Sequence, residues 1–254
     1  MSCADAFDDY WSYDDPNKWH ERFPAAGGRV QSPINIKLDE TVRQHYPPFI
    51  FSPNYADKLL FTLKNTGHQV AATLAKRNDI ENQPDLWFTG GGLSGKFHFV
   101  NFHLHWGSND RHGSEHEIDG REFPSEAHFV HKNFENKQVA VFAFFFDIAG
   151  PLHEENIEWK HYADGATHLK NIGDTFNYMF DLSHLMQIEG RQFFRYTGSL
   201  TTPPCTEGVI WTIFPNIIPI AETSLNLLRD NVMRKVYRPV QPINDRIIYR
   251  NYDD

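Results

Sequence analysis

The segment from Phe97 to Trp106 reads FHFVNFHLHW, and it decides the fold and the chemistry that we expect. Its alternating pattern and its many aromatic residues predict a β-strand, in which residues two apart point to the same face. His103 and His105 are therefore expected side by side on one face of a sheet. Two imidazoles in that arrangement can both reach a single cation.

A third histidine, His128, follows in a second strand-like run, EAHFV at residues 126–130. A stretch rich in Gly, Asn and Asp separates the two runs, as expected of a connection between paired strands. Three neutral nitrogen ligands on paired strands, with no obvious fourth protein ligand, are typical of a catalytic Zn²⁺ that keeps one coordination position open. A single His-x-His pair would more often be a coincidence, and it is the third histidine that favours the metal.

Two polar residues support this hypothesis. Asn101 lies two residues before His103, and Glu126 lies two residues before His128. Each pair shares a strand face, so each polar side chain can accept the second ring N–H of its histidine. Such acceptors fix the tautomer and the orientation of metal ligands.

The composition excludes some classes of function. The 254 residues carry a net charge of −9, which argues against nucleic acid as a partner because that requires a basic surface. The 21 Phe, 10 Tyr and 6 Trp residues can build a substantial core. No apolar run approaches the ~18 residues needed for a membrane span. A small-molecule substrate and a monomeric protein are our further expectations.

The amino terminus has no charged or apolar segment of the signal-peptide type. The protein is expected to be either cytoplasmic or a secreted mature domain whose targeting segment has been removed. Cys3 and Cys205 are either two reduced thiols or one bridge, which would indicate an oxidising compartment. No Asn-x-Ser/Thr sequon occurs, which favours a compartment without glycosylation.

The pattern along the chain predicts one mainly β domain (α+β) over residues 1–254, with residues 1–30 as an irregular arm pinned by aromatic side chains. Short alternating runs bounded by Gly, Asn, Asp and Pro predict strands at 59–74, 93–106 and 123–131. Residues 139–146 are apolar on both faces, as in a strand at the centre of a sheet.

Helices are expected to be few and peripheral. Ser224 to Val236 is the clearest, with Leu225, Leu228 and Val232 on one face and two basic residues in the last turn. A second is expected within residues 154–170.

The chain resembles the α-class carbonic anhydrases over nearly its whole length. The family fold is a large, mostly antiparallel, twisted central sheet with short peripheral helices and a conical active-site cleft. That resemblance implies a zinc enzyme that interconverts carbon dioxide and bicarbonate. The motifs that carry it are QSPINI at 31–36, NTGH at 65–68, FHLHWG at 102–107, GSEH at 113–116, EAHFVH at 126–131 and YTGSLTTPP at 196–204.

The resemblance also implies a role for each matching residue. His103, His105 and His128 correspond to the zinc ligands. Asn101 and Glu126 correspond to acceptors for ligand histidines, and Thr201 and Glu115 to the pair that orients the attacking hydroxide. His68 corresponds to the proton shuttle, with Tyr13 in its water network. The residues that correspond to the substrate pocket are Val130, Val141, Leu200, Thr202 and Trp211.

These assignments are chemically reasonable. A carboxylate such as Glu115 only accepts hydrogen bonds, so it fixes the direction in which the Thr201 hydroxyl points. Histidine, with a pKa near 6.5, suits proton relay at neutral pH. The open metal position is expected to accept sulfonamide and small-anion inhibitors.

Other interpretations remain open. The chain could be an acatalytic binding or matrix module that keeps the fold without the chemistry, and ester hydrolysis could be a side activity of the same site. Glu115 and His116 could be an ordinary buried polar pair, and His68 could be a surface histidine. The remaining histidines for which we expect only a solvated surface are at positions 20, 45, 153, 161 and 168.

The chain also departs from the family pattern. Thr66 and Ala71 occupy positions where the family often has Asn or Gln beside the proton-transfer waters, which places the efficiency of the shuttle in question. The loop at Cys205 resembles that of secreted members, but Ala26 occupies the position of the usual partner cysteine. Cys3 is then the remaining candidate partner.

Overall fold

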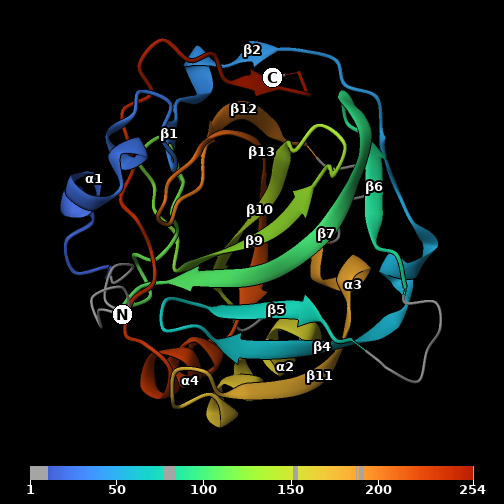
Figure 1. Cartoon of the computed structure of the whole chain (residues 1–254), viewed down its shortest axis with the longest axis vertical. Helices are drawn as coiled ribbons and strands as arrows, with labels where there is room; N and C mark the ends of the chain where they lie inside the picture. The colour runs from blue at the N-terminus through green and yellow to red at the C-terminus, as the bar shows by residue number, and fades with distance from the viewer. Residues whose placement is uncertain (1–10, 77–83, 151–153, 187, 189–191, 254) are drawn as a thin grey trace, which may run out of the picture.

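A twisted sheet runs through the middle of the molecule (Figure 1). This computed structural model describes residues 11–76, 84–150, 154–186, 188 and 192–253. Among these residues, twelve strands form the large sheet and two form a small parallel sheet. The main path of the large sheet has the order β11-β4-β5-β7-β9-β10-β13-β12-β14-β2, with β3 pairing with β6 and β6 pairing with β7.

The two longest strands are β7, at Leu93–Trp106, and β13, at Glu207–Ile220. The strands between and beside them are β9 at Ser125–Lys132, β10 at Val139–Ile148, β12 at Phe194–Ser199, β4 at Lys58–Asn65, β5 at Val70–Leu74 and β11 at Thr175–Asp181. The short strands are β1 at Asn35–Ile36, β2 at Val42–Arg43, β3 at Phe49–Phe51, β6 at Trp87–Gly90, β8 at Glu117–Ile118 and β14 at Tyr249–Arg250.

Most strand pairs of the large sheet are antiparallel. Within the part of the chain that is described, the parallel pairs of this sheet are β10 with β13 and β14 with β2. Strand β10 lies between β9 and β13 at the middle of the sheet, and it is buried on both faces because its alternate side chains pack into two different apolar clusters. This confirms the mainly β, mostly antiparallel fold and the central position expected for residues 139–146.

Alternation along β7 and β9 divides their side chains between two faces. On one face, Phe102, Leu104 and Phe129 join the main apolar core. The opposite face carries His103 and His128, which are paired in the register of the two strands. The sheet therefore supports the histidines from beneath with a close-packed aromatic layer, which holds their backbone rigidly.

The helices are short and lie outside the sheet. Helix α2 spans Ile157–Gly165, inside the expected range, and the Asn156 side chain caps it by accepting from the backbone N–H groups of residues 158 and 159. The others are α1 at Trp19–Arg22, α3 at Leu182–Met186 and α4 at Glu222–Asn231, with single 3₁₀ turns η1 at Pro16–Lys18, η2 at Pro24–Gly27, η3 at Leu38–Glu40, η4 at Pro53–Ala56 and η5 at Ala166–His168.

Helix α4 corrects one boundary. We expected a helix to Val236 with basic residues in its last turn, but α4 ends at Asn231. The residues after α4 form hydrogen bonds with the end of β7 instead. The Trp106 indole N–H donates to the carbonyl of Met233 at 2.8 Å, and Val236 N–H donates to the carbonyl of Trp106 at 2.8 Å. These tertiary hydrogen bonds stabilise the segment after Asn231 more than a further turn of α4 would.

The described part of the amino-terminal arm is held by aromatic rings, as expected. Trp11, Tyr13 and Trp19 pack edge to face with centroid distances between 5.0 and 5.7 Å. The Trp19 indole N–H also donates to the carbonyl of Ser12 at 2.8 Å. Among the described residues, no helix is long and apolar enough to cross a bilayer.

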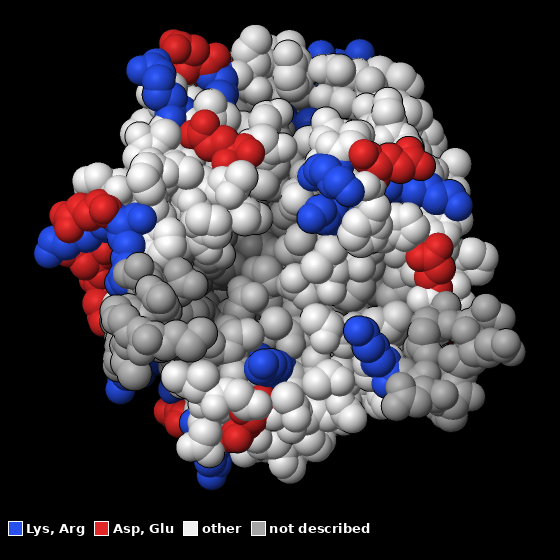
Figure 2. Space-filling view, viewed as in Figure 1, with Lys and Arg blue, Asp and Glu red and all other residues white. Residues whose placement is uncertain are grey.

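Figure 2 shows the same face of the molecule hollowed near its middle, above the region of β9 and β10. The resemblance implies an active-site cleft on this side of the sheet.

Candidate metal centre

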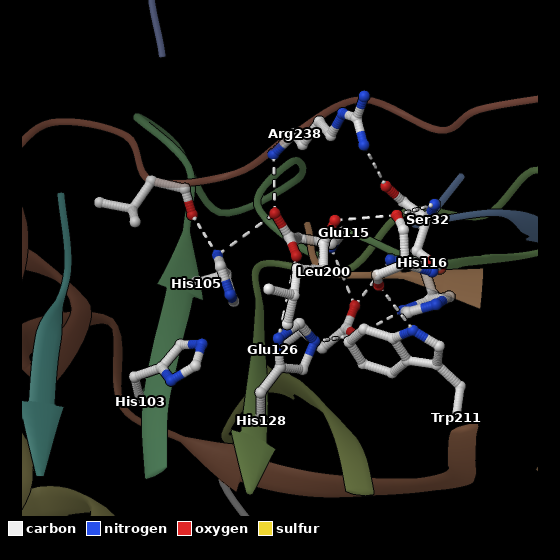
Figure 3. A network of polar contacts seen from close by, with 12 residues as sticks. Ser32, His103, His105, Glu115, His116, Glu126, His128, Leu200, Trp211 and Arg238 are labelled. Atoms are coloured by element: carbon white, nitrogen blue, oxygen red, sulfur yellow. Dashed lines mark hydrogen bonds and ion pairs between the residues drawn. The ribbon is translucent and has the colours of Figure 1, made fainter. Parts of the chain in front are cut away.

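Three buried histidines come together on adjacent strands. His103 and His105 extend from β7 and His128 from β9, all on the face opposite the main core. One ring nitrogen from each lies within 4.8 Å of the other two. Figure 3 shows the three rings turned toward a common space. The strand register thus assembles the group that the His-x-His spacing predicted.

Each ring also donates its second N–H to a fixed acceptor. This fixes the tautomer, so that the remaining nitrogen of each ring is the one with a free lone pair. The contacts are Nδ1 of His103 to Oδ1 of Asn101 at 2.8 Å, Nδ1 of His105 to the carbonyl of Val236 at 2.9 Å, and Nε2 of His128 to Oε1 of Glu126 at 2.7 Å.

The donor set fits Zn²⁺. Burial lowers the pKa of His103, His105 and His128, so the rings are neutral, as metal ligands must be. Nε2 of His105 is buried and has no hydrogen-bond partner in the described structure. An orphaned buried nitrogen costs about 1–3 kcal/mol unless something binds it. Three convergent neutral nitrogens are a donor set that Zn²⁺ prefers.

Glu126 is held as a carboxylate by several donors. Its Oε2 accepts from the backbone N–H of Glu115 at 2.9 Å and of His116 at 2.7 Å. Its Oε1 accepts from His116 Nδ1 and from His128, both at 2.7 Å. Burial by itself would raise the pKa of Glu126, but the two histidines outweigh it and hold that pKa well below its usual range.

His116, Glu126 and His128 also lie close enough together to form a second possible metal group. Their facing atoms already bond to one another, and Nε2 of His116 contacts the Tyr196 hydroxyl at 2.7 Å. The group is therefore a hydrogen-bond network that supports His128. It continues from Tyr196 to the Ser32 hydroxyl at 2.7 Å (Figure 3).

Glu115 lies beside His105 and His128. Its Oε1 accepts from the backbone N–H of Arg238 at 2.8 Å and lies 3.4 Å from Nδ1 of His105. The Thr201 hydroxyl donates to this carboxylate and lowers its pKa, but burial and the nearby Glu126 outweigh that effect and raise it. Oε2 of Glu115 is buried and has no hydrogen-bond partner among the described residues.

Apolar side chains border His128. The Trp211 ring lies 4.8 Å from the His128 ring, and its indole N–H donates to the carbonyl of Ser199 at 3.0 Å. Val141 is buried with Trp211 in the second core cluster, and Val130 and Leu200 pack against that cluster. Thr202 is half-buried in the following loop. An apolar wall therefore lies beside the three convergent histidines, which we call the metal group.

His68 lies in the turn between β4 and β5. Because β5 pairs antiparallel with β7, with Ala72 opposite Phe102, this turn lies at the end of β7 that carries the histidines (Figure 1). The His68 ring stacks on Trp11 at 3.8 Å, with an angle of 9° between the rings. Burial lowers the pKa of His68 below 6.5.

Tyr13 is buried in the arm, and its hydroxyl has no partner among the described residues. Burial raises the pKa of Tyr13 well above 10, and the charges of Glu115 and Cys205 add to that shift. No local sequence pattern predicts this electrostatic effect of Glu115 on Tyr13.

Sequence reasoning missed two supporting groups, the backbone carbonyl of Val236 and the ring of His116. It assigned no acceptor to His105, because the acceptor is the backbone carbonyl of Val236, which any residue would provide. It left Glu115 and His116 as a possible polar pair, but each bonds elsewhere: His116 to Glu126, and Glu115 to Arg238. In the sequence, only the GSEH motif at 113–116 indicated that His116 belongs to the site.

Cys205 is buried and forms no disulfide with any described residue. Its proposed partner Cys3 lies outside the described residues. Burial raises the pKa of the Cys205 thiol to about 11. Of the two departures near His68, Thr66 uses its hydroxyl to accept from the backbone N–H of Gln69 at 3.1 Å, and Ala71 is a strand residue opposite Lys64.

Comparison with known proteins agrees with this geometry. The model of the eukaryotic-type carbonic anhydrase family matches residues 14–252. Mouse carbonic anhydrase 6 is 33% identical over 95% of this chain and 81% of its own length. Mouse carbonic anhydrase 15 is 32% identical over 94% and 82%, and human carbonic anhydrase 3 is 30% identical over 96% and 97%. The chain therefore belongs to the eukaryotic-type (α-class) carbonic anhydrase family.

Proposed function

We propose that this protein is an active, zinc-dependent carbonic anhydrase that interconverts carbon dioxide with bicarbonate and a proton. The observation that carries the proposal is the convergence of His103, His105 and His128, each with its second ring nitrogen already bonded. The family as a whole is zinc-dependent. The proposal for this chain is that the zinc ligands and the catalytic residues are retained as well as the fold.

The three imidazoles would hold the metal, and Asn101 and Glu126 would keep two of them aimed. Bound Zn²⁺ supplies a Lewis acid that lowers the pKa of water to about 7, a value taken from carbonic anhydrases as a class. Glu126 is negatively charged, so it makes His128 a stronger metal ligand. Asn101 is neutral and has a weaker effect on His103.

Thr201 and Glu115 would orient the attacking oxygen. A hydroxyl can accept a hydrogen bond from that oxygen only if its own hydrogen points elsewhere, and the Glu115 carboxylate is the acceptor that attracts it. Arg238 N–H and the buried surroundings hold Glu115 in place. The result is a positioning effect, in which the oxygen presents a lone pair to the substrate.

Val130, Val141, Leu200 and Trp211 would receive carbon dioxide, which is apolar and gains little from a polar pocket. Their packing beside His128 supports this assignment. Thr202 would lie at the polar border of the same pocket. The product bicarbonate is charged, and an apolar wall favours its release.

His68 would carry the proton outward, and Tyr13 would order water along the route. The lowered pKa of His68 keeps the ring neutral and ready to accept a proton at neutral pH. Its stacked contact with Trp11 gives the ring one stable position at the turn. Thr66 and Ala71 offer fewer polar groups for water than Asn or Gln would.

Stopped-flow hydration of carbon dioxide with a pH indicator tests the proposal directly. Zinc-loaded wild-type protein should accelerate hydration well above buffer, and His128→Ala should lose both zinc affinity and activity. A folded wild-type protein that retains one equivalent of zinc without activity would show that the proposal is wrong. Ester hydrolysis on the same preparation would measure the side activity.

The alternative function is an acatalytic binding module. A folded protein that holds no zinc at micromolar metal would favour it. The open metal position also predicts inhibition by sulfonamides and small anions, with the Thr201 hydroxyl beside their head group. Competition between a sulfonamide and bicarbonate is the observable, and sulfonamide binding that survives zinc removal would contradict this arrangement.

A further inference from the structure

A second cavity lies beside β12, apart from the metal centre. Its volume is about 580 Å³, within the range of sites that take small organic molecules. None of the three metal-binding histidines lines it. Most of its wall is apolar or aromatic, and two arginines interrupt that wall. The residues that line it are Val30, Gln44, Tyr46, Leu93, Arg195, Tyr196, Thr197, Ile210, Asp245, Arg246, Ile247 and Tyr249.

Arg195 is a buried cation in this wall, with 6% of its surface exposed. Its Nε donates to the Thr212 hydroxyl at 3.1 Å and its Nη1 to the carbonyl of Gly91 at 2.9 Å. Its Nη2 is buried without a partner in the described structure. The guanidinium carbon lies 5.0 Å from the centre of the Tyr46 ring and 5.3 Å from that of Phe193.

No carboxylate among the described residues forms an ion pair with Arg195. Burial lowers its pKa to about 10, so the side chain is still charged at neutral pH. A buried charge without a counter-ion is destabilising by several kcal/mol, about the size of the penalty for breaking a buried ion pair. An anion in the adjoining cavity would remove that penalty.

Arg246 is a second cation in the same wall, and it too lacks a carboxylate partner in the described structure. It donates to three backbone carbonyls, at Ile243, Pro242 and Thr197, with distances of 2.8, 2.7 and 3.5 Å. Its guanidinium carbon lies 5.6 Å from the centre of the Tyr196 ring. Neutral carbonyls leave its charge uncompensated.

One carboxylate does line the cavity. Asp245 pairs with Arg29 at 3.2 Å, and both of these side chains are exposed, so the pair is weak. Asp245 would repel an incoming anion. Two guanidinium groups and one solvated carboxylate therefore line the cavity. Glu207 lies outside the lining, but its charge also acts on Arg246.

We propose that this cavity is a binding site for a small organic carboxylate. The planar guanidinium of Arg246 or Arg195 matches a carboxylate in geometry and charge. The apolar body of the ligand would lie against side chains such as Leu93, Ile210 and Tyr46. The site is separate from the metal centre, so its occupation does not depend on the proposed enzymatic activity.

Benzoate is a suitable probe, and benzamide is its neutral control of nearly equal shape. The zinc-loaded protein would be titrated with each, and the Nε–H signals of its arginines and the ring signals of its histidines followed by NMR. Benzoate should shift the Arg195 and Arg246 signals and bind at least about 10-fold more tightly than benzamide, as expected for a charge-assisted hydrogen bond. Shifts confined to the metal-binding histidines would overturn the proposal.

Two neighbouring variants make a matched pair. Arg246→Gln should weaken benzoate binding about 10-fold, while Asp245→Asn should strengthen it because it removes the repelling charge. Arg195→Lys keeps the buried charge but loses the planar fork, and it should also weaken binding. Equal affinities for benzoate in wild type, Arg246→Gln and Asp245→Asn would show that no such site exists. Circular dichroism and zinc content would establish that each variant is folded.

Discussion

The backbone N–H of Arg238 donates to Oε1 of Glu115 at 2.8 Å, although the two residues are 123 positions apart in the chain. The Arg238 side chain, 2% exposed, then turns to the amino-terminal segment. Its Nη1 donates to Gln31 and to the carbonyl of Ser32, and its Nη2 to the carbonyl of Ala26 (Figure 3). Arg238 therefore connects the Glu115 carboxylate to the segment at residues 26–32.

Arg238→Lys should destabilise the protein more than its conservative character suggests. Lysine keeps the charge, but its donors all lie on one nitrogen, whereas Arg238 reaches its acceptors from two nitrogens of a planar fork, so buried carbonyls lose their partners. We expect the free energy of unfolding to fall by about 2–4 kcal/mol, measured by urea denaturation of the zinc-loaded protein. Arg246→Lys is the control, because that side chain is more exposed, and it should cost about 1 kcal/mol or less. Equal losses in both variants would contradict this view of Arg238.

Glu126→Gln should weaken zinc binding by about 10–100-fold and leave the fold intact. The amide has no charge to strengthen His128 as a donor, and it cannot accept from all the groups that now surround the carboxylate. Competition with a chromophoric chelator measures the affinity. Asn101→Ala removes a neutral acceptor from His103, so its effect should be the smaller of the two. A larger effect for Asn101→Ala would rule out charge as the reason.

His68→Ala should lower turnover in weak buffer while leaving zinc affinity unchanged. The reason is that His68 belongs to the turn after β4 and not to the three-histidine group. Imidazole added to the buffer should restore much of the rate, because a diffusing base of similar pKa can carry the same proton. His168→Ala is the matched control, since that exposed ring stacks on Phe176 and has no proposed role. Unchanged turnover in His68→Ala would assign proton export to another group.

His131 should make the fold sensitive to acid. It is fully buried, with Nε2 accepting from the Tyr55 hydroxyl at 2.7 Å, and burial lowers its pKa to about 3. The unfolded chain takes up this proton near pH 6.5 and the folded chain does not. Stability from this residue is therefore complete above pH 6.5 and is lost as pH falls toward 3, at up to about 1.4 kcal/mol per pH unit.

Urea denaturation at pH 7 and pH 5 would measure this effect. His131→Gln should be less stable than wild type at pH 7, but it should lose less stability between the two values because glutamine does not titrate. Parallel losses in wild type and variant would mean that other groups control the acid sensitivity. The comparison should use zinc-loaded protein, since the metal-binding histidines also compete for protons.

Local sequence determined a large part of this protein. The alternation of residues 97–106 defined β7 to its last residue, and the i, i+2 rule placed His103 with His105 and Glu126 with His128. These features follow from strand geometry, which depends only on neighbouring residues. The apolar run at 139–146 likewise showed that its strand would be buried on both faces, because no polar side chain there could face water.

Tertiary structure decided the rest. The carbonyl of Val236 accepts from His105, and the N–H of Arg238 donates to Glu115, both from distant parts of the chain. Backbone groups carry no residue-specific signal, so no pattern could assign them. The end of α4 was set in the same way, by hydrogen bonds to Trp106 instead of by helix propensity. Only the folded sheet brings these segments together, because contacts across more than a hundred residues depend on packing and not on local periodicity.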